Sequence, residues 1–177
     1  RQGSVWSDDP AVQQKIASRL GWLSSPVLMA ESLGRLQTFA DGVRRGGLTD
    51  VVLLGMGGSS LAPEVLRAVL GVAPGWPRLH MLDSTDPAAV QAVSTPPERT
   101  LYILASKSGT TIEPNALASY FRQTLEVRVR RWADHFDAFC ADPAAPSARH
   151  ANRRQQGQLV VDPSSQLRWP TTVTGFP

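Results

Sequence analysis

The stretch from Asp50 to Ser60 constrains the fold of this chain more than any other segment. It begins with the wholly apolar run Val51–Leu54, which is typical of a strand buried on both faces of a parallel sheet. Gly-Met-Gly-Gly-Ser-Ser (55–60) follows, and apolar positions then recur with helical spacing from Leu61 to Val69. Strand, glycine turn and helix form an arrangement in which backbone N–H groups receive an anion. The stretch therefore predicts a buried strand that ends at an anion site.

A second loop, Ser-Lys-Ser-Gly-Thr-Thr (106–111), has the same setting. It follows a predicted strand at 100–105 and precedes a long helix predicted from about Ile112. Loops at the carboxyl ends of parallel strands open on one edge of the sheet, where ligands bind. We therefore expect both loops to face the same ligand.

The remaining elements alternate between strand and helix. Two helices are expected first, opening at Asp8-Asp9-Pro10 and Ser25-Pro26 and ending at Gly21 and Gly46-Gly47. After the first strand, a helix is expected to open at Ala62-Pro63-Glu64, followed by a strand at 79–82, a helix from Asp86-Pro87 and the strand at 100–105. The stretch 135–140 could add a fourth strand, although Asp137 interrupts its apolar run. This order predicts a parallel sheet with right-handed crossovers and helices on both faces.

The sequence divides into three parts. Residues 1–48 form a helical lead-in, residues 49–142 form the α/β domain, and residues 143–177 form an irregular tail. The tail is rich in Pro, Ala, Ser, Arg and Gln, and only Leu159-Val160-Val161 could form a short strand.

Composition excludes several functional classes. The net charge of +3 comes without a dense basic face that carries interleaved aromatic residues, so no nucleic-acid partner is expected. No apolar run is long enough to span a membrane, so no membrane partner is expected either. The single cysteine, Cys140, fits the reducing cytoplasm. The chain begins at Arg1 without a signal peptide, and we interpret it as a piece of a longer protein.

The two loops supply a dense set of hydrogen-bond donors. Glycines allow the backbone to approach a ligand closely, and hydroxyls and one lysine add side-chain donors. The candidate binding residues are Gly57, Gly58, Ser59, Ser106, Lys107, Ser108, Thr110 and Thr111. No carboxylate lies between Ser106 and Thr111, so phosphate is the expected ligand. The alternative is that the glycines only permit tight packing and the serines only cap helices. Asp83, which also follows a strand, could orient a ligand hydroxyl or could only form a turn.

A dinucleotide-binding domain is a rival interpretation. Gly55-Met56-Gly57-Gly58-Ser59-Ser60 begins like G-x-G-x-x-G, and Asp83 lies near the spacing of a ribose-binding acid. However, position 60 is serine where that fingerprint has glycine or alanine. The rival also leaves the loop at 106–111 unexplained. A P-loop fits less well, because no Gly-Lys-Ser/Thr follows the glycines.

The motifs together resemble the phosphoglucose isomerase family. They are Gly-Met-Gly-Gly-Ser-Ser-Leu-Ala-Pro-Glu-Val (55–65), Leu-Asp-Ser-Thr-Asp-Pro (82–87) and Ser-Lys-Ser-Gly-Thr-Thr-Ile-Glu (106–113), with lead-in segments at 6–10 and 19–23. The resemblance covers roughly residues 5 to 135 and is nearest to the isomerase part of bacterial transaldolase fusions. It implies a three-layer, flavodoxin-like sugar isomerase domain. It also implies that Gly58, Ser59, Ser106, Lys107, Ser108 and Thr111 surround the phosphate of glucose 6-phosphate or fructose 6-phosphate.

The resemblance implies aldose–ketose isomerisation without a cofactor or metal, but the catalytic part is missing. The family uses a glutamate, a histidine, a lysine and an arginine in a Gly-Gly-Arg stretch, and no match for them follows the second loop. His80 reads as a core or edge-strand residue, His135 as a strand start, and His150 lies in the tail. Glu64 and Glu113 read as acids in the first turn of their helices. We therefore assign no catalytic residue and expect the fragment to bind the phosphate end without turnover.

Two hypotheses remain open. The sequence departs from the family after about Asp142, which suggests a truncated or frame-shifted product. A non-catalytic phosphosugar sensor of the same fold is the alternative function, although the helices before Val51 carry no basic recognition helix. A homodimer is one assembly that the full-length protein could form.

Overall fold

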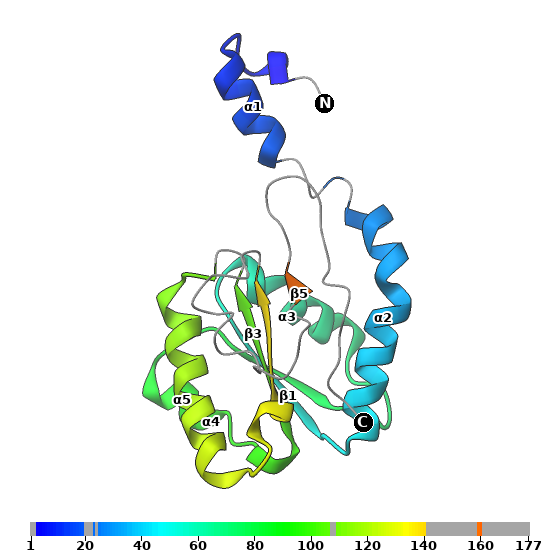
Figure 1. Cartoon of the computed structure of the whole chain (residues 1–177), viewed down its shortest axis with the longest axis vertical. Helices are drawn as coiled ribbons and strands as arrows, with labels where there is room; N and C mark the ends of the chain where they lie inside the picture. Colours follow the sequence, from blue (N-terminus) through cyan, green and yellow to red (C-terminus); the bar gives the residue numbers. More distant parts are fainter. Residues whose placement is uncertain (1–2, 20–22, 24, 107–108, 141–158, 161–177) are drawn as a thin grey trace.

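A five-stranded parallel sheet forms the centre of the computed structural model, which describes residues 3–19, 23, 25–106, 109–140 and 159–160 (Figure 1). The strands are β1 (Asp50–Gly55), β2 (Arg78–Leu82), β3 (Thr100–Ser106), β4 (Phe136–Cys140) and β5 (Leu159–Val160). Their order is β2-β1-β3-β4-β5, and every neighbouring pair is parallel. This is the flavodoxin order, so the predicted fold class is confirmed.

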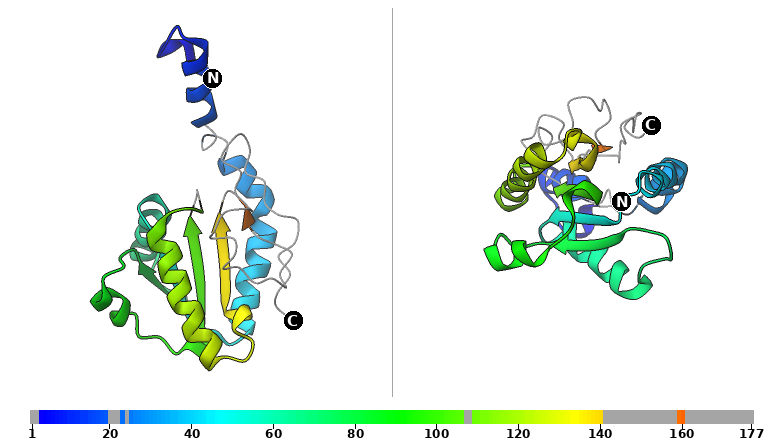
Figure 2. Two further views of the ribbon diagram at one scale, coloured as in Figure 1. Left: turned by 60° about the vertical axis from the view of Figure 1, so that its left-hand side comes forward. Right: turned by 90° about the horizontal axis from the view of Figure 1, so that it is seen from below.

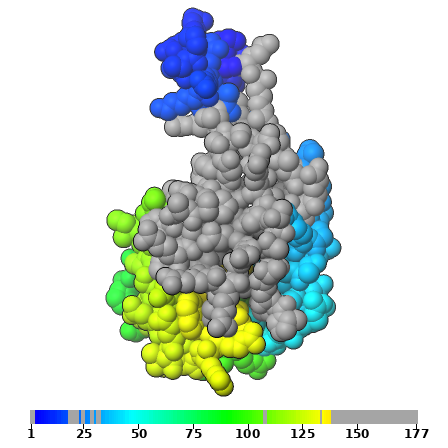
Figure 3. Space-filling view, in the orientation of Figure 1, coloured from blue at the N-terminus to red at the C-terminus, as the bar shows by residue number. Residues whose placement is uncertain are grey.

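Helices cover both faces of the sheet (Figure 2). The helices of the described chain are η1 (Gly3–Val5), α1 (Pro10–Arg19), α2 (Ser25–Arg45), α3 (Gly58–Leu70), α4 (Pro87–Ala92), η3 (Pro97–Arg99), α5 (Ile112–Arg128) and η4 (Trp132–His135). The chain leaves β1 towards β2 and leaves β3 towards β4, in opposite directions across the sheet. Right-handed crossovers therefore place α3 and α5 on opposite faces. In the space-filling view, α2 in cyan and α5 in green to yellow lie on opposite sides of the molecule (Figure 3).

Two apolar clusters follow the alternation of side chains along the strands. On one face, Val52, Leu54 and Leu104 pack with Leu117 and Phe121 of α5, and all five are buried. On the other face, a smaller cluster forms around Val43, Leu48 and Leu101 at the end of α2. Burial on both faces is the reason that β1 reads as one continuous apolar run.

Two predicted helix caps, Asp9 and Asp86, are present. Asp9 accepts the amide of Ala11 at 2.8 Å before α1. Asp86 accepts the amides of Ala88 and Ala89 at 2.8 and 3.3 Å before α4. These bonds satisfy amides that the first turn of a helix leaves without partners.

The predicted start of the third helix is wrong. The helix was expected to open at Ala62-Pro63-Glu64, but α3 begins at Gly58 and has Pro63 inside it. Proline lacks an N–H group and is tolerated near a helix start, so its position alone does not mark the first residue. As a consequence Glu64 is not in the first turn, which contains no acidic residue, and it pairs instead with Arg67 at 3.7 Å.

The two strands predicted near the C-terminal end of the described chain are present at least in part. The fourth strand forms as β4 despite Asp137. Two of the three residues proposed for a short strand in the tail form β5, and Val161 lies outside the described residues, as does most of 143–177. Helix α1 lies at one end of the molecule, away from the sheet (Figure 1). Across the described residues, no helix is long and apolar enough to cross a membrane.

Candidate functional site

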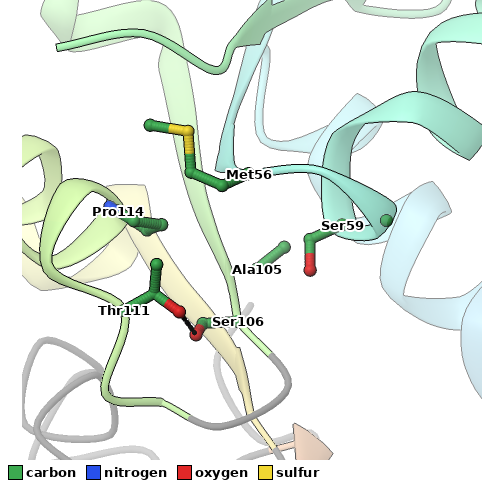
Figure 4. A pocket seen from close by; sticks show the side chains of 7 residues that line it. Met56, Ser59, Ala105, Ser106, Thr111 and Pro114 are labelled. Atoms are coloured by element: carbon green, nitrogen blue, oxygen red, sulfur yellow. Dashed lines mark hydrogen bonds between the residues drawn. The ribbon is translucent and has the colours of Figure 1, made fainter.

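The two predicted loops meet at one pocket. Gly55 at the end of β1 pairs with Ala105 near the end of β3, so the loops that follow these strands are neighbours. The chain crosses the sheet in opposite directions from these two strands, and ligands in open α/β sheets bind at this switch point. The pocket has a volume of about 540 Å³ and is lined by Met56, Gly58, Ser59, Ala105, Ser106, Thr111 and Pro114 (Figure 4).

The wall of the pocket on the β1 side is the first turn of α3. Gly57 precedes the helix with φ +54°, a left-handed conformation that favours glycine. The Gly57 carbonyl accepts the amides of Ser60 and Leu61 at 3.0 and 2.9 Å, and also the Ser60 hydroxyl at 3.1 Å. Ser60 is fully buried. Its side chain therefore holds the turn, while Ser59 beside it lines the pocket.

The wall on the β3 side joins the end of that strand to α5. Ser106 is 4% exposed, and its Oγ accepts the Gly109 amide at 3.1 Å. Ser106 Oγ also lies 3.5 Å from Thr111 Oγ1, and the two oxygens point towards each other (Figure 4). Thr111 is the N-cap residue of α5, but its side chain makes no capping bond to the helix. Both hydroxyls therefore lie at the pocket wall at the start of α5.

Only some of the eight candidate binding residues line the pocket. Gly58, Ser59, Ser106 and Thr111 line the pocket together. Gly57 lies directly before them in the chain, and Thr110 is exposed and is not part of the lining. Lys107 and Ser108 lie outside the described residues.

Sequence reasoning missed the apolar part of the lining. Met56, Ala105 and Pro114 contribute it, and each lies within three residues of a predicted binding residue. The Met56 side chain lies across the pocket from Ser106 (Figure 4). The position of Met56 between two loop glycines was the one available signal, because an apolar wall has no motif of its own.

The electrostatics of the pocket favour an anion. None of its seven lining residues carries an ionisable side chain, so no carboxylate repels negative charge there. Two helices begin at its edge, α3 at Gly58 and α5 after Thr111. A helix N-terminus carries about half a positive elementary charge. Among the described residues, no group of three or more His, Cys, Asp and Glu side chains could hold a metal ion.

Among the described residues, the others considered for chemistry are not part of the pocket lining. Asp83 directly follows β2, is exposed, and is not in the lining. His135 lies just before β4, with its Nδ1 3.0 Å from the Thr100 carbonyl oxygen. Glu113 lies in the first turn of α5 as predicted. His150 lies outside the described residues.

His80 belongs to an ionic cluster around one buried carboxylate at the opposite end of β1. Strand β2 is the sheet edge, which confirms the predicted position, and His80 Nε2 lies 2.7 Å from Oδ1 of the fully buried Asp50. Arg78 donates to both Asp50 oxygens at 3.0 and 3.2 Å, and Thr49 donates at 2.8 Å. With a rise of roughly 3.3 Å per residue, Asp50 lies about 16 Å along β1 from Gly55. The cluster therefore has no direct role at the pocket.

The pKa of Asp50 reflects two opposing effects. Burial raises the pKa because it disfavours the charged carboxylate. Hydrogen bonds from His80, Arg78 and Thr49 outweigh burial, so the pKa lies below its usual value of 3.8. Asp50 is therefore a charged structural group at neutral pH.

The fold and the pocket define a flavodoxin-like α/β domain with an open site at its switch point. A model of the family described as "Phosphoglucose isomerase" matches residues 28–154. The chain belongs to this family. The match reaches past Asp142, the position after which the sequence was expected to depart from the family.

Individual relatives agree with this assignment. The glucose-6-phosphate isomerase of Cereibacter sphaeroides is 35% identical over 136 residues, which cover 71% of this chain and 26% of that protein. This chain therefore spans about a quarter of the length of that curated relative.

Two solved structures also match the chain. A glucose-6-phosphate isomerase from Chlamydia trachomatis matches with a TM-score of 0.58 and 26% identity, over 73% of this chain and 27% of that one. A hypothetical protein from Thermus thermophilus matches with a TM-score of 0.60 and 29% identity, over 81% of this chain and 32% of that one.

Proposed function

We propose that this chain is the phosphate-binding part of a glucose-6-phosphate isomerase, which interconverts glucose 6-phosphate and fructose 6-phosphate. The observation that carries the proposal is the pocket between β1 and β3, where Gly58, Ser59, Ser106 and Thr111 converge. The family assignment supplies the substrate class, because the curated relative is a glucose-6-phosphate isomerase.

The pocket suits the phosphate end of such a substrate. Hydroxyls of Ser59, Ser106 and Thr111 can donate to phosphate oxygens, and the dipoles of α3 and α5 add to the attraction. Lys107 follows Ser106 directly in the sequence and would supply the positive charge that the described lining lacks. Thr110, Ser108 and Gly57 remain candidates for further contacts. No cofactor or metal takes part in this proposal.

The pocket lacks groups for the chemical step. Isomerisation moves a proton between C1 and C2, which requires a general base. None of the seven lining residues can act as a base near neutral pH. We therefore propose that the chain binds substrate but does not turn it over by itself. A coupled assay of the isolated chain tests this: absence of isomerase activity is expected, and sustained turnover would refute it.

The dinucleotide-binding rival makes a different prediction. In that fold the third glycine permits close helix–strand packing, whereas here the fully buried Ser60 occupies that position and bonds back to Gly57. A thermal melt separates the two functions. Fructose 6-phosphate at a concentration well above its Kd should raise the Tm, whereas NAD should not. Protection by NAD alone would favour the rival, and protection by a sugar phosphate without turnover in any longer form of the protein would favour the sensor.

Further features belong to the same proposal. We propose the division into 1–48, 49–142 and 143–177, a place in the cytoplasm, and a homodimer as the assembly of the full-length protein. Fusion to a transaldolase is a proposal about the gene. Because the family match continues to residue 154, a frameshift directly after Asp142 is not proposed.

A further inference from the structure

Asn115 connects the second loop of the pocket to helix α5. Its Nδ2 donates to the Gly109 carbonyl at 3.1 Å and to the Thr111 carbonyl at 2.7 Å. Gly109 lies before the helix, whereas Thr111 is its N-cap residue. One amide group therefore fastens the loop to the first turn of α5.

Gly109 in turn is hydrogen-bonded to a residue that lines the pocket. Gly109 is buried with φ +66°, and its amide donates to Ser106 Oγ at 3.1 Å. Ser106 Oγ in turn lies 3.5 Å from Thr111 Oγ1. The chain of contacts from Asn115 thus reaches both hydroxyls of the α5 side of the pocket. Asn115 itself is not part of the lining, so its effect on a ligand must pass through these residues.

The NH₂ group of Asn115 makes hydrogen bonds, whereas the rest of the side chain is unfavourable at this position. Its Oδ1 is buried and has no hydrogen-bond partner in the described part of the chain. A buried acceptor without a partner is unfavourable, and asparagine is also a poor helix former. Leucine has a similar size and would avoid both penalties. Leucine could not make the two hydrogen bonds that Nδ2 donates, so we infer that these bonds offset the two penalties.

We propose that Asn115 is a positioning residue for the anion-binding loop. It holds Gly109 so that the Gly109 amide fixes the Ser106 hydroxyl before the ligand arrives. Preorganisation of this kind increases affinity because less ordering remains to be done on binding. The inference rests on the proposed function, since it concerns the same pocket.

The test compares Asn115→Leu with Thr124→Val. Thr124 lies on the same helix, and its Oγ1 donates to the Tyr120 carbonyl at 3.1 Å, so the control also removes a side-chain bond to a helix carbonyl. We expect titration with fructose 6-phosphate to show about tenfold weaker binding for Asn115→Leu and unchanged binding for Thr124→Val. Amide hydrogen exchange without ligand should be faster at Gly109 in Asn115→Leu and unchanged at Leu125, which is buried in the same helix.

The outcomes separate this inference from the proposed function. Wild-type affinity in Asn115→Leu, or unchanged exchange at Gly109, would overturn the role of Asn115. If the wild type itself does not bind fructose 6-phosphate, the proposed function fails, while the exchange at Gly109 still decides whether Asn115 positions the loop. If Asn115→Leu does not fold, Asn115→Asp provides the second variant. It retains the size of the side chain but turns a carboxylate oxygen towards the two carbonyls, so faster exchange at Gly109 is again expected.

Discussion

The amide of Gly109 donates to Oγ of Ser106 across 3.1 Å, so the Ser106 hydroxyl has a structural partner before any ligand binds. A serine hydroxyl offers one hydrogen and two lone pairs. Ser106 Oγ accepts from Gly109, and its one hydrogen is directed to Thr111 Oγ1 at 3.5 Å. The hydroxyl can therefore donate to an anion in the pocket only by turning this hydrogen away from Thr111. The sequence predicted Ser106 only as a ligand contact, whereas the structure shows that it also holds the loop.

Loss of Lys107 should weaken binding of a sugar phosphate strongly. A hydrogen bond to a charged group contributes about 1.5–3 kcal/mol, so Lys107→Ala is expected to lower the affinity for fructose 6-phosphate by roughly 10- to 100-fold. Lys15→Ala is the matched control, because it removes the only other lysine, an exposed residue on α1. Calorimetric titration measures both variants. Equal affinity of Lys107→Ala and Lys15→Ala would remove Lys107 from the site.

Replacement of Gly55 by alanine should strain the contact of β1 with Ser59 and Ala105. A Cβ there would lie 3.2 Å from both Cβ and O of Ser59 and 3.3 Å from O of Ala105. Two of these neighbours are backbone atoms that cannot turn away, so we expect Gly55→Ala to cost about 1–3 kcal/mol of the free energy of unfolding. Urea denaturation measures this cost.

Gly34→Ala is the control for Gly55→Ala. Gly34 lies within α2, and a Cβ there would meet no atom within 4 Å. Alanine favours the helix over glycine by roughly 0.5–1 kcal/mol, so this variant should be more stable than the wild type. Similar stability changes for the two variants would contradict the tight contact at Gly55.

Gly57 should tolerate alanine less well than its neighbour Gly58. Neither site has an atom within 4 Å of an added Cβ, but only Gly57 has a positive φ, at +54°. With ψ at −120°, Gly57 has a sparsely populated conformation that costs an ordinary residue about 1–3 kcal/mol, so Gly57→Ala should unfold at a lower urea concentration than Gly58→Ala. If Gly58→Ala proves the less stable of the two, the assigned backbone conformation of this turn is wrong.

Asp50 should stabilise the fold at neutral pH through its charge. Asp50→Asn removes the charge on the acceptor for Arg78, His80 and Thr49, and we expect it to cost about 1–3 kcal/mol of unfolding free energy at pH 7. Asp41→Asn is the control, since the Asp41–Arg44 pair at 3.1 Å is exposed and such pairs contribute about 0.2–1 kcal/mol.

The effect of Asp50 should depend on pH in one direction. Its folded pKa is lowered, so its contribution is complete above the unfolded pKa of about 3.9 and is lost as the pH falls through the lower folded value. The difference in unfolding free energy between wild type and Asp50→Asn should therefore shrink below about pH 4. A difference that grows on acidification would mean that the Asp50 pKa is raised.

Periodicity and capping signals were sufficient to predict most of the fold. The apolar runs at 51–54 and 100–105 and the caps at Asp9 and Asp86 gave the elements, and their alternation gave the parallel sheet. The start of α3 does not follow the proline signal: Ala62-Pro63-Glu64 predicts a helix start, whereas the glycine-rich turn itself enters the helix at Gly58. For the same reason Glu64 lies beyond the first turn, in which the sequence pattern predicts it.

The sequence predicted the polar residues of the pocket lining but not the apolar ones. Gly58, Ser59, Ser106 and Thr111 belong to loops with a recognisable composition, so sequence could name them. The apolar residues of the lining and the bonds made by Asn115 depend on how β1, β3 and α5 pack together. No local pattern encodes these contacts.

The central claim is that the pocket between β1 and β3 holds the phosphate end of a sugar phosphate. The most direct measurement is a titration of the ¹⁵N-labelled chain with fructose 6-phosphate, followed through its amide NMR signals. Shifts should concentrate at Gly58, Ser59 and Thr111, while Asp50 and His80 at the far end of the sheet stay unchanged. Saturating fructose 6-phosphate that leaves the pocket amides unmoved, or that moves only amides elsewhere, would contradict the claim.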